Sequence, residues 1–156
     1  MNMKRSSLLN RNIESIKDGK HECKILAIRP MVYGEDIPMN ERKAKMLINI
    51  IIDNTTLHTV YAPNERQCID NSYTMSVYDD IVFGLLDQTS VDKAIIDNID
   101  DDNPEEVMVL LKSKVFPCWV ITNNASNGKS YKNVVFTETQ KVKDHMQAIS
   151  LLAELE

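Results

Sequence analysis

One segment of the chain, residues 45–61, constrains the fold more than any other. Residues 45–52 (KMLINIII) are rich in β-branched side chains, Asp53 and Asn54 interrupt this run, and residues 55–61 resume it before Pro63. β-Branched residues favour strands, and a short polar break between two such runs is typical of a tight turn. The segment therefore predicts a β-hairpin.

The turn of this hairpin decides which side chains share a face of the sheet, because the side-chain period of a strand is two. A two-residue turn centred on residues 53–54 or on residues 54–55 gives the same result. The face expected to form the core then carries Met46, Ile48, Ile50, Ile52, Leu57, Thr59 and Tyr61. The opposite face, which is mixed in polarity, carries Lys45, Leu47, Asn49, Ile51, Thr56, His58 and Val60.

Patterns on either side of the hairpin predict further strands and helices. Strand-like segments cover residues 21–28, 115–122 and 131–137, and helical spacing covers residues 73–88 and 140–155. A long loop rich in Pro, Gly and charged residues covers 29–43. Two shorter helices are expected in between, one with Ser90 as its N-cap and one with Asn103 as N-cap and Pro104 at the first helical position.

The chain is therefore ordered as strand, long loop, hairpin, helices, hairpin and helix. We expect an α+β fold that is mainly β, with a five-stranded barrel of the OB type, helices between strands 3 and 4, and a C-terminal helix. The expected boundaries are a polar arm over 1–18, an OB-like domain over 19–138 with a helical insert at about 73–112, and an amphipathic helix over 139–156.

The formal net charge of −5 would oppose binding to nucleic-acid phosphates if it were spread evenly. Residues 79–106, however, hold ten acidic residues and a single basic residue, Lys93. The rest of the chain holds 13 acidic and 17 basic residues, a balance of +4. Acidity is therefore concentrated in the helical insert, and the remainder of the chain is mildly basic.

No pattern in the sequence predicts a catalytic site, a metal site or a cofactor. Residues 79–80 are an acidic pair inside a helical pattern, which separates the two carboxylates. Residues 100–102 lack the Gly and the closing Glu of a calcium loop, and residues 128–130 lack the upstream glycine of a phosphate loop. The three cysteines are widely spaced, and Cys23 and Cys118 are expected in the core. We expect that the protein is not an enzyme.

Basic and aromatic residues instead gather on segments that an OB barrel would bring together. In single-strand binding, cations contact phosphates and aromatic rings stack on bases, each stack contributing about 1–3 kcal/mol. The nucleic-acid-binding candidates on these segments are Arg29, Tyr33, Arg42, Lys43, Lys45, Asn49, His58, Lys112, Lys114, Trp119, Lys129, Tyr131 and Lys132. Trp119 and Tyr131 fit a structural role as well as a binding role, and both interpretations stay open.

With these segments in place, the chain resembles the OB-fold single-stranded DNA-binding proteins, especially the divergent ones of phages and mobile plasmids. The resemblance lies in the strand order and in two stretches, residues 116–123 (FPCWVITN) and 131–136 (YKNVVF). It implies a binding surface on strands 2 and 3 and on the loops that join strands 1–2 and 4–5. Housekeeping members end in a Gly-rich tail with an acidic tip, whereas this chain ends in the helical pattern of residues 140–155.

We therefore expect non-sequence-specific binding of single-stranded DNA, with RNA as an alternative that the pattern does not distinguish. The rival hypothesis is a protein–protein interaction or accessory module of a phage or plasmid, acting through the acidic insert or the C-terminal helix. That helix could also mediate self-association. The chain has neither a run of ~20 apolar residues nor a signal-peptide core. We expect no membrane association and a cytoplasmic location.

Overall fold

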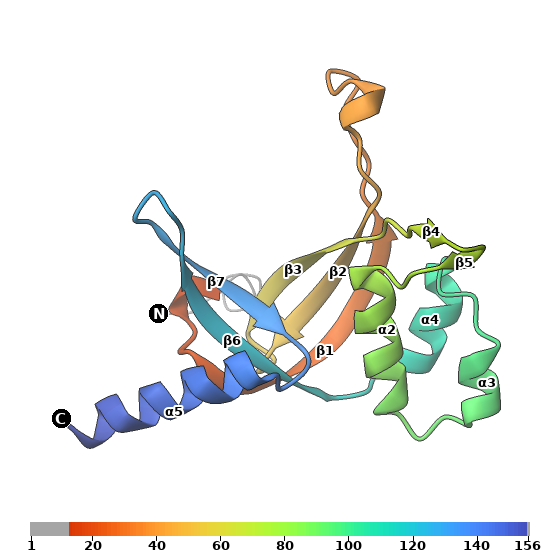
Figure 1. Cartoon of the computed structure of the whole chain (residues 1–156). Helices are drawn as coiled ribbons and strands as arrows, with labels where there is room; N and C mark the ends of the chain where they lie inside the picture. Colours follow the sequence, from red (N-terminus) through yellow and green to blue (C-terminus); the bar gives the residue numbers. More distant parts are fainter. Residues whose placement is uncertain (1–12, 156) are drawn as a thin grey trace, which may run out of the picture.

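The computed structural model describes residues 13–155 (Figure 1). Its elements are η1 (Ile13–Ser15), β1 (Gly19–Pro30), η2 (Met39–Glu41), β2 (Lys45–Ile52), β3 (Thr56–Pro63), β4 (Cys68–Ile69), β5 (Ser72–Tyr73), α2 (Val77–Asp87), α3 (Lys93–Asp97), α4 (Pro104–Leu111), β6 (Phe116–Asn124), β7 (Ser130–Val135) and α5 (Gln140–Glu154). Most of the predicted N-terminal arm, residues 1–12, and the last residue of the predicted C-terminal helix lie outside the described residues.

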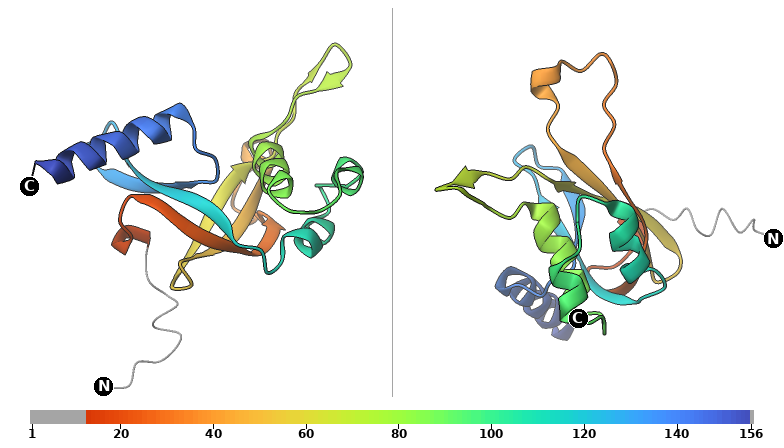
Figure 2. Two further views of the ribbon diagram at one scale, coloured as in Figure 1. Left: turned by 90° about the horizontal axis from the view of Figure 1, so that it is seen from below. Right: turned by 90° about the vertical axis from the view of Figure 1, so that its right-hand side faces the viewer.

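Within residues 13–155, five strands form one curled antiparallel sheet in the order β3-β2-β1-β6-β7. The long strand β1 is its centre, because residues 23–30 pair with β2 and residues 19–23 pair with β6. The short helix η1 contacts both edge strands, β3 and β7, and its Ile13 is buried in the core. Figure 2 shows the sheet wrapping around this core. The predicted α+β fold with a barrel-like five-stranded sheet and a C-terminal helix is confirmed at this level.

The β2–β3 hairpin forms where it is predicted, but its loop has three residues, Asp53, Asn54 and Thr55. Asp53 and Asn54 both have positive φ, 51° and 58°, which Asp and Asn tolerate better than other non-glycine residues. The carboxylate of Asp53 accepts a hydrogen bond from the backbone N–H of Glu22 in β1 (3.2 Å), and the Asp53 N–H donates to the Glu22 carbonyl (2.9 Å). The neighbouring strand therefore holds the loop in this conformation.

This loop shifts the register of β3 by one residue from the prediction. Ile50 pairs with His58, and Leu47 pairs with Tyr61. The core face of β2 is as predicted, with Met46, Ile48, Ile50 and Ile52 buried. The expected placement of Leu57, Thr59 and Tyr61 beside them is wrong, because these side chains lie on the outer face. Because the loop has three residues and not two, every side chain of β3 lies on the opposite face from the one predicted.

A β-bulge in β1 changes how its side chains alternate. Ile25 pairs with Ile50 and Ala27 pairs with Asn49, so Leu26 is an extra residue without a cross-strand partner in β2. The bulge allows both Ile25 and Ile28 to be buried in the core while Leu26 is exposed. Beyond Cys23, β1 has no strand partner on its β6 side within residues 13–155, and α4 packs against it there.

The helical insert differs from the prediction at its start. Residues 68–73 form the small β4–β5 hairpin, and α2 begins at Val77, because Ser76 makes a capping box with Asp79. The next helix, α3, is capped by Asp92 and not by Ser90. The start of α4 is as predicted, with the Asn103 side chain accepting from Glu105 N–H and Pro in the first turn.

The inner face of the sheet and the insert share one apolar core. Its largest fully buried side chains outside β2 are Tyr78, Val82, Leu85, Leu86, Val107, Leu111, Phe116 and Val120. Cys23 and Cys118 are buried there as thiols, as expected. The helices therefore cover one end of the curled sheet, and the outer face of β1–β3 stays exposed (Figure 1).

Candidate nucleic-acid interface

The outer face of β1, β2 and β3 presents three cross-strand rows of side chains. The register places Arg29, Leu47 and Tyr61 in one row, Ala27, Asn49 and Thr59 in the next, and Lys24, Ile51 and Leu57 in the third. Because neighbouring strands lie about 4.8 Å apart, each row spans about 10 Å. Two of the three rows thus carry a cation at the β1 end and an apolar or aromatic side chain at the β3 end.

A hollow of about 550 Å³ opens on this side of the sheet. It is lined by Leu26, Ala27, Asn49, Ile50, Leu57, His58, Thr59 and Tyr61. Tyr61 is 59% exposed, and Leu26 and Leu57 are exposed as well. The Thr59 hydroxyl donates to Asn49 Oδ1 (2.9 Å), which fixes the polar pair between them. An exposed ring beside apolar side chains is the arrangement on which a nucleic-acid base can stack.

The β1–β2 loop, residues 31–44, projects beyond the sheet (Figure 1). The Tyr33 hydroxyl donates to the Lys43 carbonyl (2.6 Å), and the Arg42 guanidinium donates to two loop carbonyls (2.8 and 3.1 Å). These two predicted binding residues therefore hold the shape of the loop. The Lys43 side chain is exposed, and Lys45 at the start of β2 is half-buried.

The β6–β7 hairpin lies beyond the N-terminal end of β1 and the β1–β2 loop follows its C-terminal end, but both project toward the same side of the molecule (Figures 1 and 2). Lys129 and Tyr131 are exposed on it, as the prediction requires of binding residues. Lys132 differs, because its ammonium group contacts the Ile16 carbonyl and lies 3.5 Å from the Asp18 carboxylate. It is mostly buried and has a structural role, which corrects its assignment to the binding site.

Trp119 lies beneath α5 and presents no surface for stacking a base. It is 7% exposed and packs with Ile121 and Val142, with the half-buried Met146 against the same cluster. Lys20 Nζ lies 5.8 Å from the ring centroid. Of the two roles that the sequence left open for Trp119, the structure supports the structural one, and its place among the binding residues is wrong.

The docking of α5 depends on the carboxylate of Asp18, just before β1. Asp18 accepts hydrogen bonds from the Thr122 backbone N–H (2.8 Å) and hydroxyl (2.7 Å) in β6, and it contacts His145 Nε2 in α5 (2.8 Å). Burial opposes its ionisation, but the hydrogen bonds from Thr122 and His145 outweigh burial and hold the pKa of Asp18 below its usual range. One anionic group therefore joins the first strand, β6 and the C-terminal helix.

The remaining predicted residues lie away from the two loops. His58 is half-buried beside Ile50, and burial lowers its pKa, so it is neutral at neutral pH and adds no charge for phosphate. Its assignment to the mixed outer face is therefore wrong. Lys112 is exposed at the C-terminal end of α4, where it lines a second hollow, and Lys114 is half-buried.

The acidic residues of the insert converge on Arg66, in the segment after β3. The guanidinium group of Arg66 contacts the carboxylates of Asp79 (2.6 Å), Asp101 (3.0 Å) and Asp102 (3.0 Å). Asp79 and Asp101 are buried. The hydrogen bonds from Arg66 hold the pKa of Asp79 well below its usual range, whereas burial, then the hydrogen bond to Asp79 and the charge of Asp79, raise the pKa of Asp101 to about 7.

Carboxylate oxygens of Asp100, Asp101 and Asp102 lie within 4.8 Å of one another, a spacing that a metal ion could use. Arg66, however, already supplies the cation that Asp101 and Asp102 bind. We therefore interpret the cluster as the anchor that joins the insert to the end of β3.

The structure thus groups Arg29, Lys45 and Asn49 on one face, with Lys43 on the adjoining loop. Tyr61, the main aromatic residue of that face, is predicted from the sequence on the core face, and Leu26, Leu57 and Lys24 are not among the predicted binding residues. The sequence carries no clear signal for Tyr61, because an Asp-Asn pair that tolerates positive φ also suits a two-residue turn, which would place Tyr61 on the core face.

Comparison with protein-family models found no match, and a search of curated proteins found none either. Among residues 13–155, none of the helices has the length and apolar character needed to cross a membrane. Function is therefore inferred from the geometry of the outer face and its loops.

Proposed function

We propose that this protein binds single-stranded DNA without sequence specificity, through a barrel of the OB type. The observation that carries the proposal is the outer face of β1–β3, where the exposed Tyr61 ring borders a hollow and Arg29 lies in the same cross-strand row. Bases would stack on Tyr61 and pack against Leu26 and Leu57. Phosphates would run along the cations at the β1 side of the rows.

The architecture supports an OB-type site. An OB barrel binds on the face of its second and third strands and on the loops between strands 1–2 and 4–5. Here β2 and β3 carry most of the hollow, and the long β1–β2 loop and the β6–β7 hairpin project toward the same side of the molecule (Figure 1). The insert α2–α4 lies between the third and fourth strands of the sheet, as the OB outline requires.

The charge distribution is compatible with this proposal despite the net charge of −5. Three acidic side chains of the insert are bound to Arg66, and the insert covers one end of the sheet. The charges of these three carboxylates are therefore offset by Arg66, and none of them lines the hollow. Single strands should be preferred over duplexes, because bases already stacked in a duplex cannot stack on Tyr61.

The test is fluorescence anisotropy of labelled oligo-dT with the wild type and with Tyr61→Ala, at several salt concentrations. Loss of one stacking ring, worth about 1–3 kcal/mol, should weaken binding roughly 5- to 150-fold. Tyr73→Ala is the matched control, because Tyr73 is an exposed tyrosine on β5 that does not line the hollow. Arg29→Ala should reduce the salt dependence by about 0.7 in log–log slope, the contribution of one phosphate contact on a single strand.

Equal affinities of Tyr61→Ala and Tyr73→Ala would contradict the assignment of the hollow. Absence of binding by the wild type at low salt would contradict single-strand binding altogether. Oligo-U in the same titration compares RNA with DNA, and tighter binding of oligo-U would change the ligand to RNA.

One observation favours a second candidate function, protein–protein interaction through α5. The first half of α5 packs on β6–β7, but its last residues expose Leu151, Leu152 and Leu155 (54%, 64% and 83%). Such an apolar end could bind a second copy or another protein. Sedimentation velocity checks self-association, which Leu152→Lys should abolish if the helix end forms the contact.

A further inference from the structure

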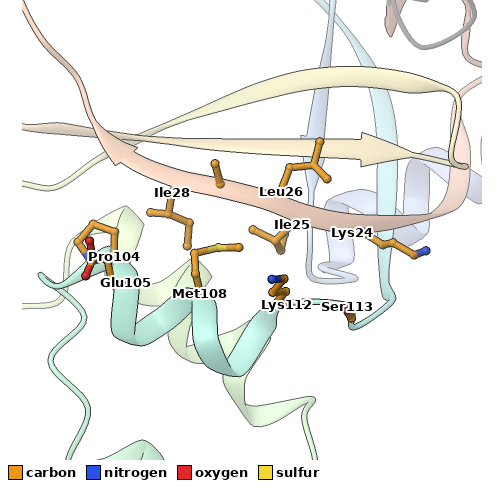
Figure 3. Close-up of a pocket in the computed structure, with 10 residues that line it drawn as sticks. Lys24, Ile25, Leu26, Ile28, Pro104, Glu105, Met108, Lys112 and Ser113 are labelled. Atoms are coloured by element: carbon orange, nitrogen blue, oxygen red, sulfur yellow. The ribbon is translucent and has the colours of Figure 1, made fainter. Parts of the chain in front are cut away.

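A second hollow, of about 560 Å³, lies between α4 and the part of β1 that follows Cys23. It is lined by Lys24, Ile25, Leu26, Ala27, Ile28, Pro104, Glu105, Met108, Lys112 and Ser113 (Figure 3). β1 is paired only with β2 along this stretch within the described residues, so α4 and not a strand forms the other wall. We call this hollow the β1–α4 groove.

The groove adjoins the hollow on the outer face. Leu26 and Ala27 of β1 line both hollows. The bulge at Leu26 is responsible, because it adds a side chain that faces away from the core between the two hollows. A ligand that crosses β3, β2 and β1 on the outer face would therefore reach the β1–α4 groove next.

The two ends of the groove differ in charge (Figure 3). Lys24, Lys112 and Ser113 lie at one end, and Pro104 with Glu105 lies at the other. Between them, the thioether side chain of Met108 extends from α4 toward β1. A phosphate is therefore attracted to the lysine end and repelled from the Glu105 end, while the middle offers apolar contacts to a flat ring.

We propose that one nucleotide of a bound single strand occupies the β1–α4 groove, with its base against Met108 and its phosphate at Lys112. This inference rests on the proposed single-strand binding and extends its path from Tyr61 on β3 to α4. A pocket of this volume fits a small-ligand group such as a base with its sugar. A peptide strand pairing along β1 is disfavoured, because α4 packs against that side of β1.

The path can be tested by the length of the DNA. Short oligo-dT covers the outer face alone, and longer oligo-dT also reaches the groove, so wild-type affinity should rise by about tenfold when the added nucleotide enters it. Lys112→Glu should remove this rise and leave the affinity for the shortest binding oligonucleotide unchanged. Lys93→Glu is the matched control, because it reverses one exposed lysine of the insert outside the groove.

A second variant reports on the groove directly. Met108→Trp introduces an indole where the base is expected, and long oligo-dT should quench its emission while short oligo-dT should not. The native Trp119 is buried beneath α5 and provides the unquenched background, measured in the wild type.

Each outcome has a distinct meaning. If Lys112→Glu and Lys93→Glu bind every length equally and Met108→Trp is not quenched, the groove assignment is overturned while single-strand binding stands. If the wild type binds no oligo-dT at low salt, the proposed function fails and the groove assignment fails with it.

Discussion

Replacing Asp101 by asparagine should make the protein more stable at pH 8 and flatten its stability profile above pH 5. Burial and the nearby charge of Asp79 raise the pKa of Asp101 to about 7 from an ordinary 3.8. Between these two values the folded protein keeps a proton on Asp101 that the unfolded chain has released. Wild-type stability therefore falls as pH rises through this window.

Asparagine resembles the protonated form of Asp101. Its oxygen can still accept from the Arg66 guanidinium, which contacts Asp101 Oδ1 at 3.0 Å. In the wild type, Asp101 Oδ2 is buried without a hydrogen-bond partner among the described residues. The amide group of asparagine at this position can donate a hydrogen bond to Asp79, as a protonated Asp101 would. The variant thus keeps the contacts and removes the titration.

The size of this stability change follows from the difference between the folded and unfolded pKa values of Asp101. A folded-state pKa of about 7 and an unfolded value of 3.8 correspond to roughly 3 kcal/mol of wild-type stability lost between pH 5 and pH 8. The variant should avoid this loss, so the two proteins should differ by about 1–3 kcal/mol more at pH 8 than at pH 5.

Urea unfolding followed by far-UV circular dichroism at pH 5, 6, 7 and 8 measures this difference. Asp102→Asn is the control, because Asp102 also contacts Arg66 but its side chain is 54% exposed and its charge is the smallest contribution to the raised pKa of Asp101; this variant should still lose stability between pH 5 and pH 8. Parallel profiles for Asp101→Asn and the wild type would refute the reasoning, since the proton on Asp101 would then not contribute to stability.

Two further predictions concern the anchors of the fold. Arg66→Met should cost about 3–5 kcal/mol in urea unfolding at pH 7, because Asp79 would stay charged in a buried site without its partner; a loss below about 1 kcal/mol would contradict this role. Asp18→Asn should cost about 1–2 kcal/mol at pH 7 and increase acrylamide quenching of Trp119, since α5 loses its contact at His145. Because the pKa of Asp18 is lowered in the folded state, the wild-type advantage should be present above about pH 4 and lost as pH falls further. Quenching equal to that of the wild type would show that Asp18 does not hold the helix.

Several elements could be predicted from the sequence because their causes act over a few residues. Asn103 and Pro104 begin α4 as expected, since cap and first-turn preferences depend on the immediate backbone. The alternating isoleucines of β2 face the core, because a strand has a side-chain period of two. The helical spacing predicts a start at residue 73, but α2 begins at Val77, because Ser76 caps it and residues 68–73 pair as a hairpin.

The candidate site was less predictable, because burial depends on segments that are distant in the chain. Lys132 is a basic residue in a hairpin and could bind phosphate, but its ammonium group contacts Asp18 and the carbonyl of Ile16. Trp119 fits a stacking platform in its strand, yet α5 covers it through Val142. Tyr61 is exposed because the three-residue loop at Asp53, which β1 holds in place, sets a register that directs Tyr61 to the outer face.

The sequence by itself determined the strands of the hairpins, the apolar face of β2, the C-terminal helix and the separation of acidic from basic segments. These properties arise from local side-chain periods, turn residues and composition. Only the tertiary structure decided which aromatic rings face solvent, which lysines are already paired, and that the two hollows meet at Leu26. The physical reason is that exposure and pairing are set by contacts between strands and helices that the chain brings together only when it folds.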